Sequence, residues 1–169
     1  MEENIVSLDI KRIAAKAFQL SIFVAIAVAA PYFVNQLITG SIVNALLFIS
    51  AVMLGLESAF FLCLIPSLIS IYTGLLPIAL VPMIPFIMTG NALLVLIFYK
   101  FGKQKFWQGA MPAVIIKFAF ICVVGIVLAN SVLSGIAPAV MIIISWPQLA
   151  TALAGACVAY LFLKTIKKI

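Results

Sequence analysis

The chain alternates between long apolar runs and short polar junctions, and this alternation constrains its fold more than any other feature. The first run, at about 13–34, carries no charge after Lys16. At about 1.5 Å per residue, such a helix is long enough to cross a hydrocarbon core of roughly 30 Å. Charged residues make up 8% of the 169 residues, against about 25% in soluble domains. We therefore expect a membrane protein.

The apolar runs predict an all-α membrane protein with six transmembrane helices in a single integral domain, residues 1–169. Residues 1–10 carry three acids and no apolar run, so they are expected to form a cytoplasmic tail. Several spans contain proline, which frees backbone carbonyls that a membrane tolerates only inside protein or beside a polar cavity. The six spans are expected at about 13–34, 42–56, 58–73, 78–99, 108–129 and 138–163.

The charges predict the topology. With six spans, all three basic clusters fall on one side: the one at 11–16, the one at 100–105 and the one at 164–168. The junctions near Gly40, Thr73 and Ser134 contain no charged residue and fall on the other side. By the positive-inside rule, both termini are cytoplasmic in a multi-pass protein of the cell membrane. This distribution of basic residues along helix ends gives no reason to expect nucleic acid as a partner.

Small residues recur at every fourth position of the first span. Positions four apart lie on one helix face, and in lipid a smooth face lets another helix approach closely. Two interpretations are open: this face packs against the protein's own helices, or it docks a partner subunit. The residues are Ala17, Ser21, Ala25 and Ala29.

The stretch 31–45, PYFVNQLITGSIVNA, clusters polar residues without charge between two apolar runs. We expect an uncharged outer loop with Gly40 as its pivot. Such a loop offers hydrogen-bonding groups to a small molecule. The candidate substrate-binding residues here are Asn35, Gln36, Thr39 and Asn44.

Lys117 is the most informative single residue, because it lies near the middle of the fifth span. A charge at the centre of a lipid-facing helix costs at least about 2.5–3.5 kcal/mol. It is expected to line a cavity or contact a ligand; the alternatives are a structural bond to proline-freed carbonyls, or snorkelling. Asn91 and Gln148 lie at similar depth, so the three residues predict an outward-opening pocket for a ligand with an anionic group.

Catalysis is not expected. The chain has no His, and its single acid beyond the tail is Glu57, which suits the first turn of a helix. No base–nucleophile pair or metal cage can be assembled from these parts, and no cofactor is predicted. Three distant cysteines in apolar runs are expected to pack as small residues.

Six spans in under 200 residues, the four-spaced small face and the polar first outer junction resemble the substrate-binding S component of energy-coupling-factor (ECF) vitamin transporters. The segments carrying the likeness are QLITG at 36–40, NALL at 44–47, PMIPF at 82–86 and GNALL at 90–94. The resemblance implies an S-component-like bundle that binds a micronutrient outside. It further implies that the first-helix face meets a transmembrane coupling subunit carrying two ATPase subunits.

These observations favour a non-enzymatic subunit for uptake of a vitamin or related small nutrient. The alternative is a structural or assembly protein that packs with partner helices through small-residue faces. A second such face is expected on the sixth span, at Ala150, Ala154, Gly155 and Ala159. A membrane-embedded enzyme is the third interpretation.

Overall fold

The computed structural model describes residues 2–102, 105–131 and 146–169, which are helical with no strand among them. In the described parts, five helices are long and apolar enough to cross a membrane, and α3 is a shorter apolar helix of 17 residues. Several apolar helices of this length indicate a membrane protein. The elements are α1 (Glu2–Ala29), η1 (Ala30–Phe33), α2 (Gln36–Met53), α3 (Leu56–Tyr72), η2 (Ile78–Met83), α4 (Ile84–Phe101), α5 (Phe106–Ser131) and α7 (Trp146–Thr165).

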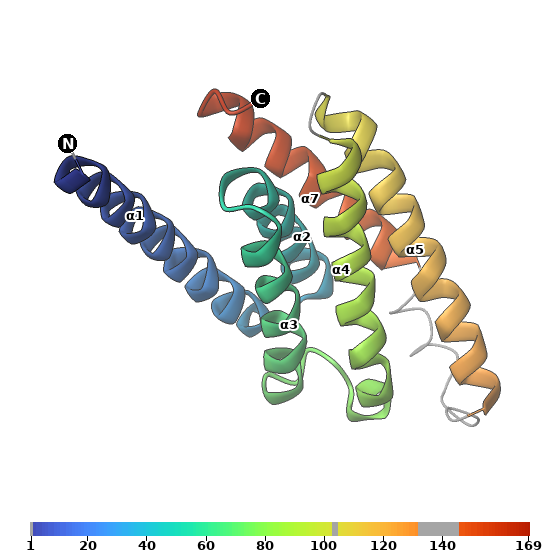
Figure 1. Ribbon diagram of the computed structural model, residues 1–169. Helices are drawn as coiled ribbons and strands as arrows, with labels where there is room; N and C mark the ends of the chain where they lie inside the picture. The colour runs from blue at the N-terminus through green and yellow to red at the C-terminus, as the bar shows by residue number, and fades with distance from the viewer. Residues whose placement is uncertain (1, 103–104, 132–145) are drawn as a thin grey trace.

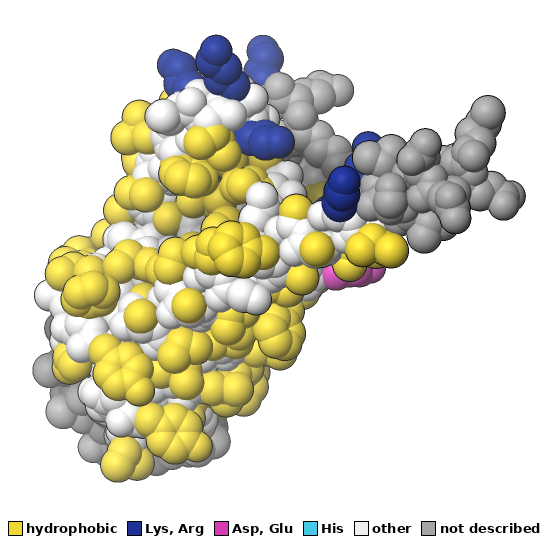
Figure 2. Space-filling view, turned by 90° about the vertical axis from the view of Figure 1, so that its left-hand side faces the viewer, with side chains coloured by type: hydrophobic (Ala, Val, Ile, Leu, Met, Phe, Trp, Pro, Cys, Tyr) yellow, Lys and Arg dark blue, Asp and Glu magenta, His cyan; other side chains and the backbone are white. Residues whose placement is uncertain are grey.

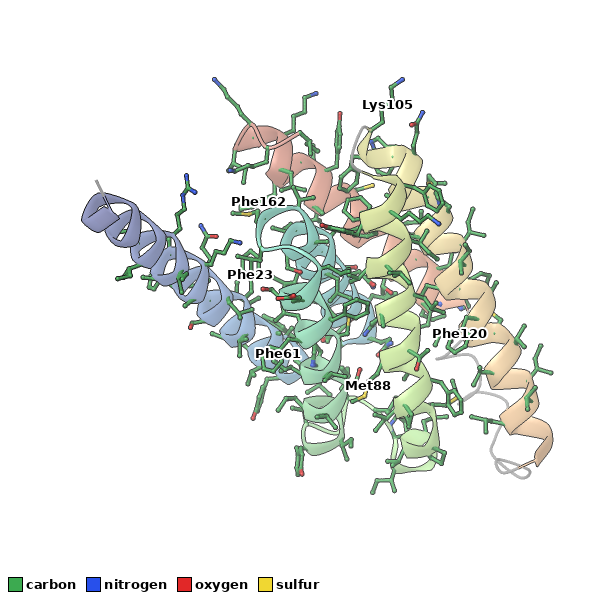
Figure 3. All side chains as sticks on the ribbon, viewed as in Figure 1. Phe23, Phe61, Met88, Lys105, Phe120 and Phe162 are labelled. Carbon is green, nitrogen blue, oxygen red and sulfur yellow. The ribbon has the colours of Figure 1, made fainter. Side chains whose placement is uncertain are left out.

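Five of these helices form a bundle, and α1 leans away from it. The helices α2, α3, α4, α5 and α7 lie beside one another, whereas α1 meets the bundle near its C-terminal end and diverges toward its N-terminus (Figure 1). Both ends of the described chain lie toward the top of the view, as does Lys105 in the α4–α5 connection (Figure 3). Hydrophobic side chains cover much of the face in Figure 2, and the Lys and Arg side chains gather in its upper part.

The close packing of α2 on α7 depends on glycine. A Cβ built on Gly155 would lie 2.6 Å from the Cβ of Asn44 and 2.8 Å from the backbone nitrogen of Ala45. A Cβ on Gly40 would lie 2.8 Å from the side chain of Thr151. Small residues let membrane helices approach closely because packing drives their association there. Gly40 is therefore a packing position, and not the loop pivot that we expected.

The expected polar loop at 35–44 is instead the start of a helix. Asn35 caps α2, and its Oδ1 accepts hydrogen bonds from the backbone N–H groups of Leu37 and Ile38 at 3.0 and 3.1 Å. Such a cap satisfies donors that a helix start leaves free. Inside α2, the side chains of Ser41 and Asn44 donate to carbonyls four residues earlier. The second span thus begins at Gln36 and not at 42.

Other boundaries also differ from expectation. The expected tail at 1–10 is helical from Glu2, because no Gly or Pro interrupts it and acids suit a helix N-terminus. Gly55, at φ 94°, separates α2 from α3, and Glu57 lies in the first turn of α3 as expected. The fourth span divides into η2 and α4 and ends at Phe101. The start of the expected sixth span and the junction near Ser134 lie outside the described residues.

The two small-residue faces differ in their surroundings. On α7, Gly155 and Ala159 are buried against the bundle, whereas Ala150 is half-buried and Ala154 is exposed. On α1, the whole four-spaced set is exposed: Ala17, Ser21, Ala25 and Ala29. Packing of this α1 face on the protein's own helices was thus a wrong interpretation for the described chain, and the face is free for lipid or a partner.

Candidate functional site

A cavity lies among α2, α3, α4, α5 and α7, in the half of the bundle away from the basic helix ends. Its volume is about 70 Å³. A cavity of this size has room for several water molecules. Its lining comprises Gln36, Thr39, Gly40, Val43, Asn44, Pro66, Ser67, Ser70, Leu75, Leu76, Ile87, Asn91, Lys117 and Gln148.

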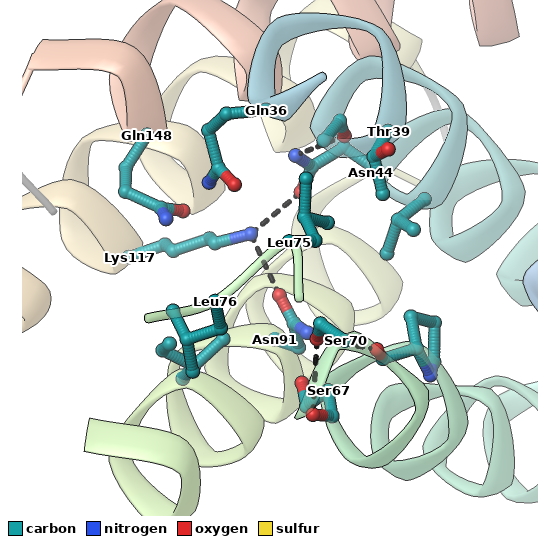
Figure 4. Close-up of a pocket in the computed structure, with 14 residues that line it drawn as sticks. Gln36, Thr39, Asn44, Ser67, Ser70, Leu75, Leu76, Asn91, Lys117 and Gln148 are labelled. Carbon is teal, nitrogen blue, oxygen red and sulfur yellow. Dashed lines mark hydrogen bonds between the residues drawn. The ribbon is translucent and has the colours of Figure 1, made fainter. Parts of the chain in front are cut away.

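Lys117 is the central group of this cavity (Figure 4). Its side chain comes from the middle of α5 and is 2% exposed. The ammonium donates to Oδ1 of Asn44 at 2.6 Å and to Oδ1 of Asn91 at 2.7 Å. This burial rules out snorkelling, and the two partners are side-chain amides, not the proline-freed carbonyls of our second alternative. Lys117 therefore lines the cavity, as expected from its depth.

The two asparagines are held in place by their own helices. Asn44 donates from Nδ2 to the carbonyl oxygen of Gly40 at 2.7 Å, which turns its Oδ1 toward Lys117. Asn91 follows Gly90, where a built Cβ would lie 3.1 Å from Ile121 and 3.6 Å from the Cγ of Lys117. The absence of a side chain at position 90 therefore lets α4 and α5 pack closely at the level of the lysine.

The positive charge of Lys117 has only neutral oxygens around it in the described chain. An ammonium has three N–H donors and no acceptor, and two of the donors are used here. The chain has four acidic residues in all; three lie at the far end of α1, at 2–9, and the fourth, Glu57, is exposed. A buried charge is costly unless it is paired. This arrangement is suited to accept an anion.

Gln148 and Gln36 extend the polar surface. Gln148 is 7% exposed at the start of α7, and Gln36 lies at the first position of α2. In Figure 4 both carboxamides lie beside the side chain of Lys117. Among the described residues, neither carboxamide has a hydrogen-bond partner, so both can serve a ligand.

The residues predicted to bind substrate divide into two groups in the structure. Gln36, Thr39, Asn44, Asn91, Lys117 and Gln148 all line the cavity. Thr39 also has a structural bond, because its hydroxyl donates to the carbonyl of Ala30 at 2.9 Å. Asn35 does not line the cavity: it is exposed, and its side chain is used in capping α2.

Sequence reasoning missed the contribution of α3. Pro66, Ser67 and Ser70 all line the cavity, and the Ser70 hydroxyl donates toward the carbonyls of Pro66 and Ser67 at 2.7 and 3.0 Å. The available signal was two serines within four residues of a proline inside an apolar span. Leu75 and Leu76, from the connection between α3 and η2, complete that side.

An aromatic cluster lies between the cavity and the basic end. Phe48 packs on Phe98 with ring centroids 4.8 Å apart, and Phe98 packs on Phe106 at 5.1 Å. All three are at most 5% exposed. Tyr160 extends the cluster from α7, 5.5 Å from Phe106. This packing closes the bundle on the side of the lysines.

No protein-family model, curated protein or solved structure matches this chain.

Proposed function

We propose that the protein is a non-enzymatic, membrane-embedded subunit that binds a small organic anion. The observation that carries this proposal is the burial of Lys117 beside the cavity. Within the described chain, its ammonium forms hydrogen bonds only with neutral side-chain oxygens. A ligand carboxylate or phosphate would supply the missing counter-charge and accept the third N–H. The amides of Gln36 and Gln148 would then bind its other polar groups.

The proposed topology has six spans with both termini in the cytoplasm. All ten basic residues lie at 11–16, 100–105, 117 and 164–168. Apart from Lys117, the described ones lie on the N-terminal part of α1 or at the ends of α4, α5 and α7 that share the top of Figure 1. The cavity then opens toward the outside, which suits uptake.

The cavity is smaller than the usual binding site for a vitamin-sized nutrient. Sites for drug-sized molecules enclose on the order of 300–1,000 Å³, several times the 70 Å³ present. Binding of a vitamin-sized ligand therefore requires the site to widen. The connection bearing Leu75 and Leu76 is the segment that we expect to move, because these two are the lining residues that lie outside the helices. Its movement must break the hydrogen bond from the backbone N–H of Leu76 to the carbonyl of Ser70.

Release to the cytoplasm requires more than this chain. The aromatic cluster of Phe48, Phe98, Phe106 and Tyr160 is packed between the cavity and the basic end. We therefore propose that a transmembrane coupling subunit with two ATPase subunits reorients the protein, in the manner of an ECF S component. The exposed small face of α1 is the proposed contact for that subunit.

The test is ligand binding to detergent-purified protein, with a panel of vitamins that carry carboxylate or phosphate groups and a set of neutral ones. We expect an anionic ligand to bind and Lys117→Met to weaken it about 10- to 100-fold, from the loss of one charge-assisted contact. Lys105→Met removes the same charge from the exposed α4–α5 connection and should leave affinity unchanged. If no panel member binds, or if the two variants behave alike, the proposal fails.

The exposed α1 face also supports a second candidate, a structural or assembly protein of the membrane. Ala25→Leu and Ala29→Leu roughen this face without touching the cavity. Co-purification separates the candidates: an assembly protein would lose its partner in these variants but keep it in Lys117→Met. A transporter subunit would lose transport in the α1 variants and in Lys117→Met, but it would lose ligand affinity only in Lys117→Met.

A further inference from the structure

A second hollow lies at the opposite end of the bundle from the Lys117 cavity. It has a volume of about 400 Å³ and shares no residue with that cavity. It lies where the C-terminal ends of α2, α4 and α7 come together. We call it the C-terminal groove; it is lined by Ala51, Val52, Phe98, Tyr99, Gly102, Lys168 and Ile169.

The turn after α7 places a cation in this groove. The backbone N–H of Lys168 donates to the carbonyl of Leu163 at 2.9 Å, and that of Lys167 donates to Lys164 at 3.1 Å. Lys167 has φ 54°, so the chain ends α7 with the paired bonds and left-handed residue of a Schellman motif. Because the motif reverses the chain, Lys168 and Ile169 fold back over the ends of α2 and α4.

The groove is amphipathic in a way that matches a phospholipid. Its walls are apolar at Ala51, Val52 and Phe98, and Lys168 contributes a cation. The helix ends around it place it at the membrane–water boundary, where lipid phosphates lie and where tyrosine and tryptophan are enriched. Two more lysines at this end lie over aromatic rings: Lys164 over Tyr160, and Lys100 over Phe101.

We propose that the C-terminal groove binds one anionic phospholipid of the leaflet on the lysine side. One acyl chain lies along Val52 and Phe98, and the ammonium of Lys168 pairs with the phosphate. Basic residues at a membrane surface attract anionic lipids, and the groove adds a shaped apolar contact that an open surface lacks. This proposal does not depend on the nutrient site, because the two hollows lie on opposite sides of the aromatic cluster.

The test is native mass spectrometry of the full chain released from nanodiscs made of equal parts phosphatidylcholine and phosphatidylglycerol with matched acyl chains. We expect the protein to retain phosphatidylglycerol preferentially, with a stoichiometry of one. Lys168→Gln should reduce that preference about fivefold, because it removes the ammonium that pairs directly with the phosphate. Val52→Phe, which fills the groove without changing charge, should reduce retention of both lipids.

Two variants serve as matched controls. Lys164→Gln removes the same charge one turn earlier from a lysine that lies over Tyr160, and Val123→Phe enlarges an exposed apolar residue of α5. Both should behave as the wild type. Equal retention of the two lipids by the wild type would overturn the proposal and favour a protein partner as the occupant of the groove. Equal losses in Lys164→Gln and Lys168→Gln would overturn it in favour of diffuse surface charge.

Discussion

The contact between Lys117 and Asn91 predicts a measurable coupling energy. The ammonium and Oδ1 of Asn91 are 2.7 Å apart, and both residues are at most 3% exposed. We consider Asn91→Leu, Lys117→Met and the double variant, each a replacement of similar shape by an apolar group. Because the two residues lie on different helices, α4 and α5, their coupling reports on the assembled bundle and not on one helix.

The magnitudes follow from the burial and the bonds. Asn91→Leu removes one charge-assisted hydrogen bond and should cost about 1.5–3 kcal/mol. Lys117→Met removes two such bonds, roughly 3–6 kcal/mol, but also removes a buried charge that costs about 2.5–3.5 kcal/mol. Its net cost is therefore about 0–3 kcal/mol. In the double variant the shared bond is lost only once, so it should be more stable than the sum of the singles by about 1.5–3 kcal/mol.

The measurement is unfolding in mixed micelles with increasing denaturing detergent, followed by loss of helical circular dichroism. The control cycle pairs Asn91→Leu with Ser21→Ala, whose hydroxyl bonds only within α1; these two changes should add within about 0.5 kcal/mol. If Asn91→Leu and Lys117→Met also add within that range, the buried contact does not exist and the proposed anion site loses its basis.

Two further predictions concern packing and orientation. Gly155→Ala should destabilise the protein by about 1–3 kcal/mol, because its Cβ would meet backbone and side-chain atoms of α2 at 2.6–2.8 Å. The control Ala154→Val, on the exposed side of α7, should change stability by less than about 0.5 kcal/mol. Equal losses of stability in the two variants would contradict the close α2–α7 contact. In a background with Cys63, Cys122 and Cys157 replaced by Ala, an impermeant maleimide should label Thr73→Cys in intact cells and Lys105→Cys only after permeabilisation. The reverse pattern would invert the proposed topology.

Local chemistry explains why some elements were predictable and one was not. Glu57 was correctly expected in the first turn of a helix, because an acid there interacts favourably with the nearby backbone N–H groups of the helix start. The helix itself begins at Leu56, two residues before the expected start of the third span at 58. The loop predicted at 35–44 was wrong because polarity alone does not distinguish a loop from a helix. Asn44 satisfies its Nδ2 donor on the carbonyl four residues earlier, so a polar stretch remains helical.

The candidate site was partly predictable for a different reason. A lone lysine in mid-span demands a sheltered surrounding, so Lys117 could be chosen without a structure, together with polar residues at similar depth. The serines of α3 gave a weaker signal, because a serine hydroxyl in an apolar span often bonds only to a carbonyl of its own helix, as that of Ser70 does. Asn35 was assigned to the site on polarity, whereas its position before an apolar run is that of a helix cap.

The amino-acid sequence by itself indicated a membrane protein and located most of its apolar helices in the described chain, although α1 and α2 begin earlier than expected. It did so because a backbone in lipid must satisfy its own hydrogen bonds, which leaves long apolar segments helical. Only the tertiary structure decided which distant residues meet. Asn44 and Lys117 are 73 positions apart, and their contact depends on the rotation and crossing of α2 and α5. The same packing buried Gly155 and Ala159 of α7 and left the small face of α1 exposed.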